Sequence, residues 1–161
     1  MSDTQVFEEW KNAGGFLVST DPGKLDVPLI HRWLSKEAHW SLEIPLELVE
    51  RAIHHSLCFG LYAPDGQQAG FGRMVTDFTT FGWVTDVFVL DAYRGKGLAR
   101  FLMECMRAHP QLQVLRRWLL GTSHAAGFYQ KLGFVPLEDP ETYFTIHISD
   151  MYQRGLHKGK V

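Results

Sequence analysis

A short glycine-bearing segment, YRGKGLA from Tyr93 to Ala99, has the composition of an anion-binding turn. Gly95 and Gly97 allow the backbone to approach a ligand closely just before a predicted helix. The first N–H groups of a helix have no intrahelical acceptor, and the positive end of the helix dipole lies beside them. Arg94 and Lys96 add positive charge. The segment is therefore predicted to bind a pyrophosphate.

Two common nucleotide-binding motifs do not fit this segment. No Lys-Ser or Lys-Thr follows the glycines, as a P-loop requires, and the three-glycine spacing of a dinucleotide-binding turn is missing. An ordinary strand-to-helix turn with solvated charges is the alternative, because short glycine motifs have many false positives.

Composition excludes several other kinds of chemistry. Cys58 and Cys105 form no C-x-x-C pair and the histidines are scattered, so no metal site is predicted. Sixteen basic and eighteen acidic side chains give a net charge of −2, which offers no electrostatic footprint for nucleic acid or an anionic membrane. No stretch has the length of a membrane span or the apolar centre of a signal peptide, so a cytoplasmic protein is expected.

The length of 161 residues predicts one domain, 1–161, with a core of about 14–149 and a C-terminal tail over 150–161. Early hairpins followed by strand-helix-strand units predict a mixed sheet flanked by helices, of the α/β (α+β) class. Helices are expected after an N-cap at Asp26, from Pro45, from Leu98 to Met106, and from an N-cap at Ser123 to Leu132. Strands are expected at 16–19, 58–63, 68–77, 83–90, 114–121, 134–137 and 143–148, and 83–90 reads as a central strand buried on both faces.

Two motifs in register resemble one protein family. Arg94, Gly97 and Ala99 fit the signature Q/R-x-x-G-x-G/A, and HAAGFYQKLGF from His124 to Phe134 is similar to a second motif of the same family. The chain thus resembles the GNAT superfamily of acetyl-coenzyme A dependent N-acetyltransferases, over roughly 26–148. The resemblance implies a mixed, mostly antiparallel sheet of six to seven strands, flanked by about four helices, with a splayed central pair of strands.

The resemblance also implies how acetyl-CoA is held. The pantetheine arm is expected to pair with the backbone of Val87, Phe88 and Val89, where the central strand splays from the next one. The pyrophosphate is expected on the loop formed by Arg94, Gly95, Lys96, Gly97, Leu98 and Ala99. Many members carry an asparagine near the second motif, and Ser123 and His124 stand there in this chain as candidate coenzyme contacts.

The resemblance places Tyr129 where a general acid is often found. Full proton transfer from a phenol to a thiolate is uphill by about 2 kcal/mol, so a hydrogen bond to the departing sulfur is the expected contribution; a core tyrosine is the alternative. Asp86 and Asp77 are candidate bases, because each lies in an otherwise apolar strand context. His39, Glu43 and His55 are weaker candidates. A covalent route through either cysteine is disfavoured.

The acceptor is expected to be a primary amine of a small molecule or a peptide. Relatives admit it beside residues that match Trp33, Trp40, Glu43, Phe81 and Trp83, and aromatic and acidic groups suit a cationic amine. Homodimers are frequent among relatives, so a homodimer is expected. The alternative function is an acyl-CoA-binding sensor or interaction module without turnover.

Overall fold

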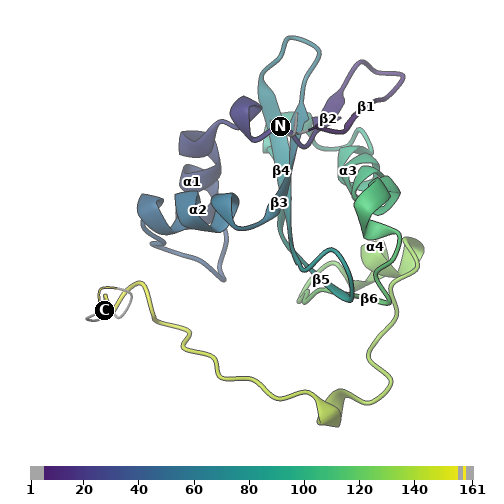
Figure 1. Cartoon of the computed structure of the whole chain (residues 1–161). Helices are drawn as coiled ribbons and strands as arrows, with labels where there is room; N and C mark the ends of the chain where they lie inside the picture. The colour runs from purple at the N-terminus through teal and green to yellow at the C-terminus, as the bar shows by residue number, and fades with distance from the viewer. Residues whose placement is uncertain (1–5, 156–157, 159–161) are drawn as a thin grey trace, which may run out of the picture. The chain divides into compact units, whose positions relative to one another are not determined.

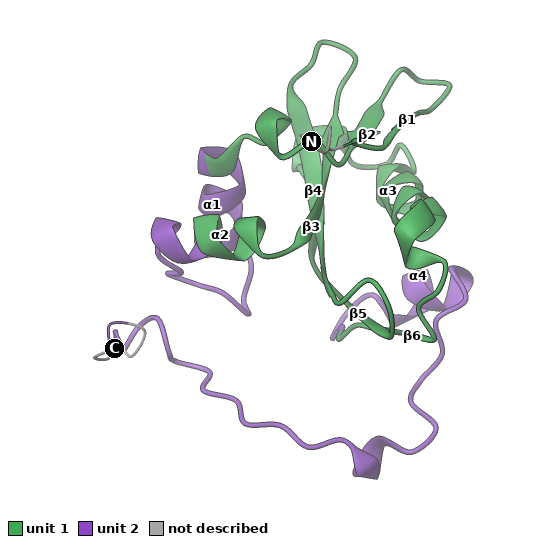
Figure 2. Ribbon diagram, in the orientation of Figure 1, with its two compact units in different colours: residues 1–27, 50–121 green, residues 28–49, 122–161 purple. Residues whose placement is uncertain are grey.

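The computed structural model describes residues 6–155 and 158. The chain forms two compact units, which Figure 2 shows in different colours. The first unit comprises the chain up to Val27 together with 50–121, and the second comprises 28–49 together with the chain from Thr122 onward. The single domain over 1–161 stays a prediction.

Every strand of the described chain belongs to the first unit and to one sheet, in the order β1-β2-β3-β4-β5-β6 (Figure 1). The strands are β1 (Glu9–Lys11), β2 (Leu17–Ser19), β3 (Leu57–Tyr62), β4 (Gln68–Thr76), β5 (Phe81–Val89) and β6 (Arg117–Leu119). Neighbouring strands are antiparallel except β5 and β6, which are parallel. The predicted mixed, mostly antiparallel sheet is confirmed.

Four α-helices accompany the sheet in the described residues, as predicted. They are α1 (Val27–Lys36), α2 (Leu46–His54), α3 (Leu98–Ala108) and α4 (Ala126–Lys131). Helix α3 packs against β3 and β5. Leu98, Leu102, Cys105 and Met106 are buried, as their helical spacing predicts. Phe101, which the same spacing predicts on this stripe, is half-buried, and Met103 is buried in addition. None of the helices in the described part of the chain is long and apolar enough to cross a membrane.

Three short elements differ from the prediction. β1 was not expected, because its three residues are mostly polar; it forms by pairing with β2, and Trp10 stacks on Phe59 with ring centroids 6.3 Å apart. β6 is shorter than the predicted 114–121. Ser123 does not cap α4, since the N-cap is Ala125, whose N–H donates to Thr122 Oγ1 at 3.0 Å.

The predicted strands at 134–137 and 143–148 do not form in the single chain. A strand needs a neighbour to accept and donate its backbone hydrogen bonds, and alternation of side chains alone does not supply one. We call residues 134–150 the C-terminal arm. Its side chains are almost all exposed.

The prediction that the central strand is buried on both faces is also wrong. In β5, Val84, Asp86 and Phe88 are buried, whereas Trp83 is 37% exposed. The strand alternates although most of its residues are β-branched or aromatic, because an aromatic side chain such as Trp83 is apolar whether or not it is covered.

Candidate active site

Strand β5 is interrupted by a bulge at its middle. Phe71 pairs with Phe88 and Arg73 pairs with Thr85, so that two residues of β5, Asp86 and Val87, oppose the single Gly72 of β4. Asp86 has φ = 54°, in the left-handed region that few residues other than glycine adopt. Such a bulge takes a backbone group out of the ladder and re-aims it.

A buried ion pair holds the bulge. Arg73 Nε donates to Asp86 Oδ2 at 2.8 Å, and Arg73 Nη1 donates to Ser56 Oγ at 2.9 Å. Thr85 Oγ1 donates to the other carboxylate oxygen of Asp86 at 3.3 Å. The side chains of Arg73 and Asp86 are only 16% and 9% exposed, so each charge depends on the other in a region poor in water.

Two glycines of β4 let neighbouring elements come close to the bulge. A Cβ at Gly70 would lie 2.5 Å from the carbonyl oxygen of Phe88, so only glycine permits this approach of the two backbones. A Cβ at Gly72 would lie 3.2 Å from Met106 Sδ of α3. The sheet and α3 are therefore packed tightly beside the bulge.

The ladder between β5 and β6 covers only the first part of β5. It joins Phe81 to Arg117, Gly82 to Trp118 and Trp83 to Leu119, and it ends there. The bulge and the Val87–Val89 segment come after this point in β5. This limited pairing agrees with the predicted splayed pair of central strands.

We call the segment from Arg94 to Ala99 the glycine loop. It follows β5 after one short turn at Asp91–Tyr93. Gly95 and Gly97 have φ = 78° and 72°, and a Cβ at either would meet no atom within 4 Å. Their conformation therefore demands glycine, while the space beside them is open. Gly97 is the N-cap of α3, and its carbonyl accepts the first helical hydrogen bond, from Phe101 N–H at 3.0 Å.

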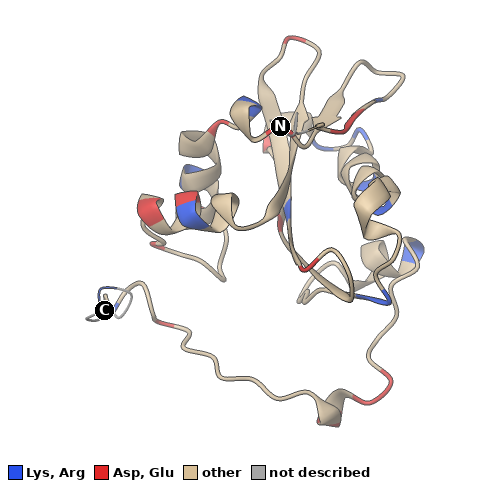
Figure 3. Cartoon of the chain, viewed as in Figure 1, with Lys and Arg blue, Asp and Glu red and all other residues tan. Residues whose placement is uncertain are grey.

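The two arginines on and just after this loop are already balanced by acids. Arg94 Nη1 lies 2.9 Å from Asp91 Oδ1, and Arg100 Nε lies 2.7 Å from Glu104 Oε1. The ammonium of Lys96 lies 5.7 Å from the centre of the Phe16 ring. Figure 3 shows basic and acidic residues interspersed over the chain. An anion bound at this loop would therefore be held chiefly by the N–H groups at the start of α3, with Lys96 in support.

Tyr129 lies on α4, in the second unit. Its ring contacts Phe128 and Phe134, with centroids 5.0 and 5.8 Å away. Burial raises the pKa of the phenol. The group therefore stays protonated at neutral pH and can donate a hydrogen bond.

An aromatic cluster gathers in the same unit from distant parts of the sequence. Trp33 and Trp40 lie 5.9 Å apart, His39 lies 5.0 Å from Trp40, and His124 lies 6.2 Å from His39, all between ring centroids. Glu43, with φ = 64°, closes the turn after α1 by donating its N–H to Ser35 O. Two predicted acceptor residues and one predicted coenzyme contact thus share one cluster.

Asp77 caps the hairpin between β4 and β5. Its Oδ1 accepts hydrogen bonds from the N–H groups of Thr79, Thr80 and Phe81, and its Oδ2 accepts from Thr80 Oγ1 at 2.7 Å. Chiefly the bonds from Thr80 hold the pKa of Asp77 well below its usual range. Such a weak base is poorly matched to proton removal near neutral pH.

Neither cysteine has the properties of a catalytic nucleophile. Burial raises the pKa of Cys58 and of Cys105 to about 12, so the thiolate is scarce at neutral pH. No group of three or more His, Cys, Asp or Glu side chains is placed to hold a metal ion within the described chain.

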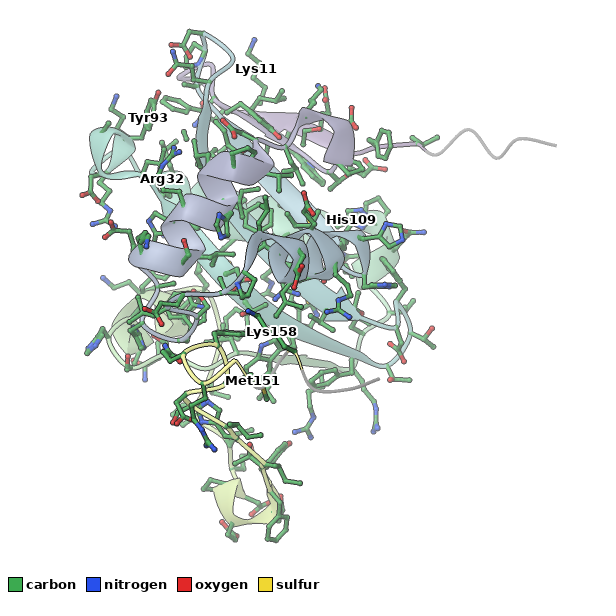
Figure 4. All side chains as sticks on the ribbon, turned by 90° about the vertical axis from the view of Figure 1, so that its left-hand side faces the viewer. Lys11, Arg32, Tyr93, His109, Met151 and Lys158 are labelled. Atoms are coloured by element: carbon green, nitrogen blue, oxygen red, sulfur yellow. The ribbon has the colours of Figure 1, made fainter. Side chains whose placement is uncertain are left out.

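A groove of about 870 Å³ lies in the first unit. His109, labelled in Figure 4, lines it together with His54 and His55. Leu57 and Thr76 also line the groove. They lie at the end of the β3–β4 hairpin that is opposite the glycine loop. Of the candidate site residues, His55, a weaker candidate base, lines this groove.

The predicted residues thus fall into two groups. The first unit contains Asp77, Phe81, Trp83, Asp86, Val87, Phe88, Val89 and the loop from Arg94 to Ala99; the second contains Trp33, Trp40, Glu43, Ser123, His124 and Tyr129. The sequence analysis missed Arg73 and Ser56. The pair could have been predicted, because β4 contains one arginine, β5 contains one aspartate, and a short hairpin joins the two strands.

Comparisons with known proteins agree on one family. Residues 54–136 match the family model described as acetyltransferase (GNAT) domain. A putative acetyltransferase of Gibberella zeae is 33% identical over 142 residues, covering 74% of this chain and 79% of that protein. A crystal structure of a putative GNAT acetyltransferase from Xanthomonas campestris is 47% identical, with a TM-score of 0.83, covering 85% of this chain and 96% of the other.

A more distant structure shares the fold. A Mycobacterium tuberculosis protein, solved in a complex that contains CoA, is 20% identical with a TM-score of 0.60, covering 85% of this chain and 80% of that one.

Proposed function

Because this chain belongs to the GNAT family of acetyltransferases, we propose that it moves an acetyl group from acetyl-CoA to a primary amine of a small molecule or peptide. We propose direct attack in a ternary complex, because neither cysteine has the properties of a nucleophile. The β5 bulge carries the proposal: it is followed, in the same unit, by an open glycine loop at the start of α3.

The first unit fits a CoA-like ligand. The glycine loop has no atom within 4 Å of either glycine's missing side chain, and the N–H groups that open α3 suit a pyrophosphate. Val87–Val89 would hold the pantetheine arm through the backbone, and Leu98 and Ala99 would hold the pyrophosphate. When bound, acetyl-CoA supplies the acetyl group and the leaving thiol.

The backbone N–H of Val87 is the proposed donor to the acyl oxygen. A donor fixed in place before reaction stabilises developing negative charge without reorganisation. The ion pair of Arg73 with Asp86 supports this role, because it fixes the residue before Val87 in its left-handed conformation. The contacts of Asp86 and Asp77 indicate that both carboxylates stabilise the local fold. Their action as bases stays a prediction.

Tyr129 is the proposed hydrogen-bond donor to the departing sulfur. Its raised pKa favours the protonated form, which is the form that donates. Tyr129→Phe is expected to lower kcat roughly 100-fold with little change in CoA affinity. Tyr152→Phe makes the same chemical change elsewhere and is expected to leave kcat unaltered. Equal kcat for the wild type and Tyr129→Phe would remove Tyr129 from the mechanism.

The pH dependence follows from the direction of that shift. A phenol with a pKa above its ordinary value of about 10 loses its proton only in strongly alkaline solution. Tyr129 is therefore expected to cause no fall in kcat between about pH 7 and pH 9.5. A pH-rate profile that falls in this range in the wild type, but not in Tyr129→Phe, would contradict the assignment.

The aromatic cluster supports a cationic acceptor. Trp33 and Trp40 lie 5.9 Å apart, and indole faces attract ammonium groups. Glu43 adds negative charge on the same turn. We propose that an ammonium group is held there, gives a proton to solvent water, and attacks the thioester carbon as the neutral amine, with the thiol as the leaving group.

Calorimetry with CoA and thiol release from acetyl-CoA over a panel of amines test the proposal. Binding followed by amine-dependent release supports acetyl transfer. Binding without release for every amine favours the alternative, an acyl-CoA sensor, and absence of binding overturns both. A homodimer and a cytoplasmic location also stay proposals.

A further inference from the structure

The groove of about 870 Å³ is a cavity of the first unit that the proposed reaction does not use. All the residues that line it belong to this unit, and none belongs to the bulge or to the glycine loop. Its volume lies within the range of about 300–1,000 Å³ that is typical of ligand sites. Its apolar lining includes Phe7, Leu57 and Phe78. The groove therefore has the size and the apolar surface of a binding site.

One wall of the groove is an unpaired edge of β3. β2 pairs with β3 only over residues 60–62, whereas β4 pairs with β3 from Leu57 onward. β2 then leaves β3, and Thr20 N–H donates to Glu8 O at 3.0 Å. Alternate residues of an antiparallel strand point their N–H and C=O groups away from the paired neighbour, so residues 57–59 direct such groups away from β4. No strand of the described chain pairs with them on this side.

A buried donor without an acceptor opens into the groove. His109 lines the groove and is only 4% exposed, and its ring centroid lies 5.8 Å from that of Phe59. Its Nδ1 accepts the N–H of Gln111 at 3.3 Å, so the proton of the neutral ring is on Nε2, and no acceptor for this proton lies within the described residues. Among those residues, Tyr62 Oη is the one side-chain polar atom that is both unpaired and fully enclosed, so Nε2 of His109 keeps access to the groove. A ligand carbonyl could accept its proton.

The charge of the lining favours a cationic ligand. Glu8 and Glu50 line the groove, and no lysine or arginine does. Neither carboxylate takes part in an ion pair within the part of the chain that the structure describes. Burial lowers the pKa of His109, and the nearby carboxylate of Glu8 opposes this shift. Phosphates and nucleotides are therefore poor candidates, because the groove offers them no arginine or lysine.

We propose that the groove binds an extended peptide segment of a partner protein, with apolar and basic side chains, as an added strand on residues 57–59 of β3. The peptide backbone would pair with the open edge, and one of its carbonyl groups would accept from His109 Nε2. A basic side chain would pair with Glu8, and apolar side chains would lie against Phe7 and Phe78. The site shares no residue with the proposed acceptor site and does not depend on acetyl transfer.

Calorimetry of the full-length chain with a pentapeptide tests this site. The probe Val-Arg-Val-Arg-Val, acetylated at one end and amidated at the other, has no primary amine and so cannot serve as an acceptor. We expect it to bind, and Val-Glu-Val-Glu-Val with the same ends to bind at least about tenfold more weakly. N-methylation of all five backbone amides of the arginine peptide is expected to abolish binding, because it removes the donors that a strand needs. Absence of binding by the arginine peptide at about 1 mM, or equal binding of its N-methylated form, overturns the proposal.

Two variants locate the peptide. His109→Asn keeps an acceptor for Gln111 N–H but removes the Nε2 donor, and it is expected to weaken binding about fivefold. Glu8→Gln keeps the shape of the side chain without its charge and is expected to weaken binding about threefold. Glu37→Gln makes the same change at an exposed residue outside the groove and is expected to leave binding unaltered. Unaltered binding in both groove variants overturns the site.

Hydrogen exchange identifies the edge that the peptide uses. Amides of residues 57–59 are expected to gain protection when the arginine peptide is added. Protection of another strand without 57–59 overturns the choice of edge. Far-UV circular dichroism and CoA affinity verify that each variant is folded, since neither His109 nor Glu8 belongs to the proposed CoA site.

Discussion

Around the β5 bulge, buried charged groups find partners within the chain, whereas along the C-terminal arm large apolar groups lie in solvent. Asp86 receives hydrogen bonds from Arg73 and Thr85. Phe144 and Ile146 are 94% and 98% exposed. The polar groups of the bulge are thus satisfied within the chain, whereas the apolar groups of the arm make few contacts. Substitutions in the two regions should therefore change the free energy of unfolding by very different amounts.

Removing the carboxylate at the bulge is expected to have the largest effect. Asp86→Ala leaves the Arg73 charge buried without its main counter-charge, and we expect a loss of about 3 kcal/mol in the free energy of unfolding. Chemical denaturation measures it, and the loss should not depend on protein concentration.

Asp86→Gly is the matched control. It removes the same carboxylate but adopts φ = 54° without strain, so it should be about 1 kcal/mol more stable than Asp86→Ala. Equal stability of the two variants would show that the left-handed backbone is not retained.

Gly97→Ala is expected to cost about 1 kcal/mol, because φ = 72° strains any residue with a Cβ. CoA affinity should fall as well, since the same residue begins α3 at the proposed pyrophosphate site. Gly127→Ala is the control: it is also uncrowded, but it lies inside α4, where alanine is the better helix former. A Gly97→Ala variant as stable as Gly127→Ala would contradict the strained loop.

Asp77→Asn tests the hairpin cap through pH. The folded-state pKa of Asp77 is lowered, so its ionised form stabilises the fold above about pH 4, and this contribution fades as the pH falls. The variant should have a lower Tm than the wild type at pH 7, and the two Tm values should converge on acidification. Its kcat should be unchanged; a large loss of kcat at unchanged Tm would instead restore Asp77 as a base.

Phe144→Ala is expected to have the smallest effect. A side chain that is 94% exposed loses few contacts on truncation, so the free energy of unfolding, measured by chemical denaturation, should change by less than about 0.5 kcal/mol. A large loss of stability would mean that the chain covers Phe144.

The sequence predicted the elements whose pattern is local. The α3 stripe follows from helical spacing, and the β3–β4 turn follows from Pro64, Asp65 and Gly66, with Gly66 at φ = 88°. The glycine loop at Gly95 and Gly97 was predicted from its place before α3, and both glycines have positive φ.

Features that depend on distant neighbours were harder to predict. The pairing of Arg73 with Asp86 depends on the hairpin register, and the His39–His124 contact joins segments far apart in the sequence. The alternation at 143–148 predicts a strand, but no strand forms there in the described residues, because alternation does not specify the neighbour that a strand must pair with.

The extra residue in β5 also determines what a one-residue deletion would do to the bulge. Cross-strand pairing puts Thr85 on the face of Arg73 and Phe88 on the face of Phe71, while the Cβ position of Gly72 lies 3.7 Å from Val87 Cγ2 on the α3 side. If Asp86 were deleted, the side chains of Thr85, Val87 and Phe88 would alternate regularly across the same faces. A deletion of Asp86 would thus straighten the ladder, but it would also leave the Arg73 charge buried without its counter-charge. The irregularity of the strand and the stability of the sheet therefore depend on the same residue.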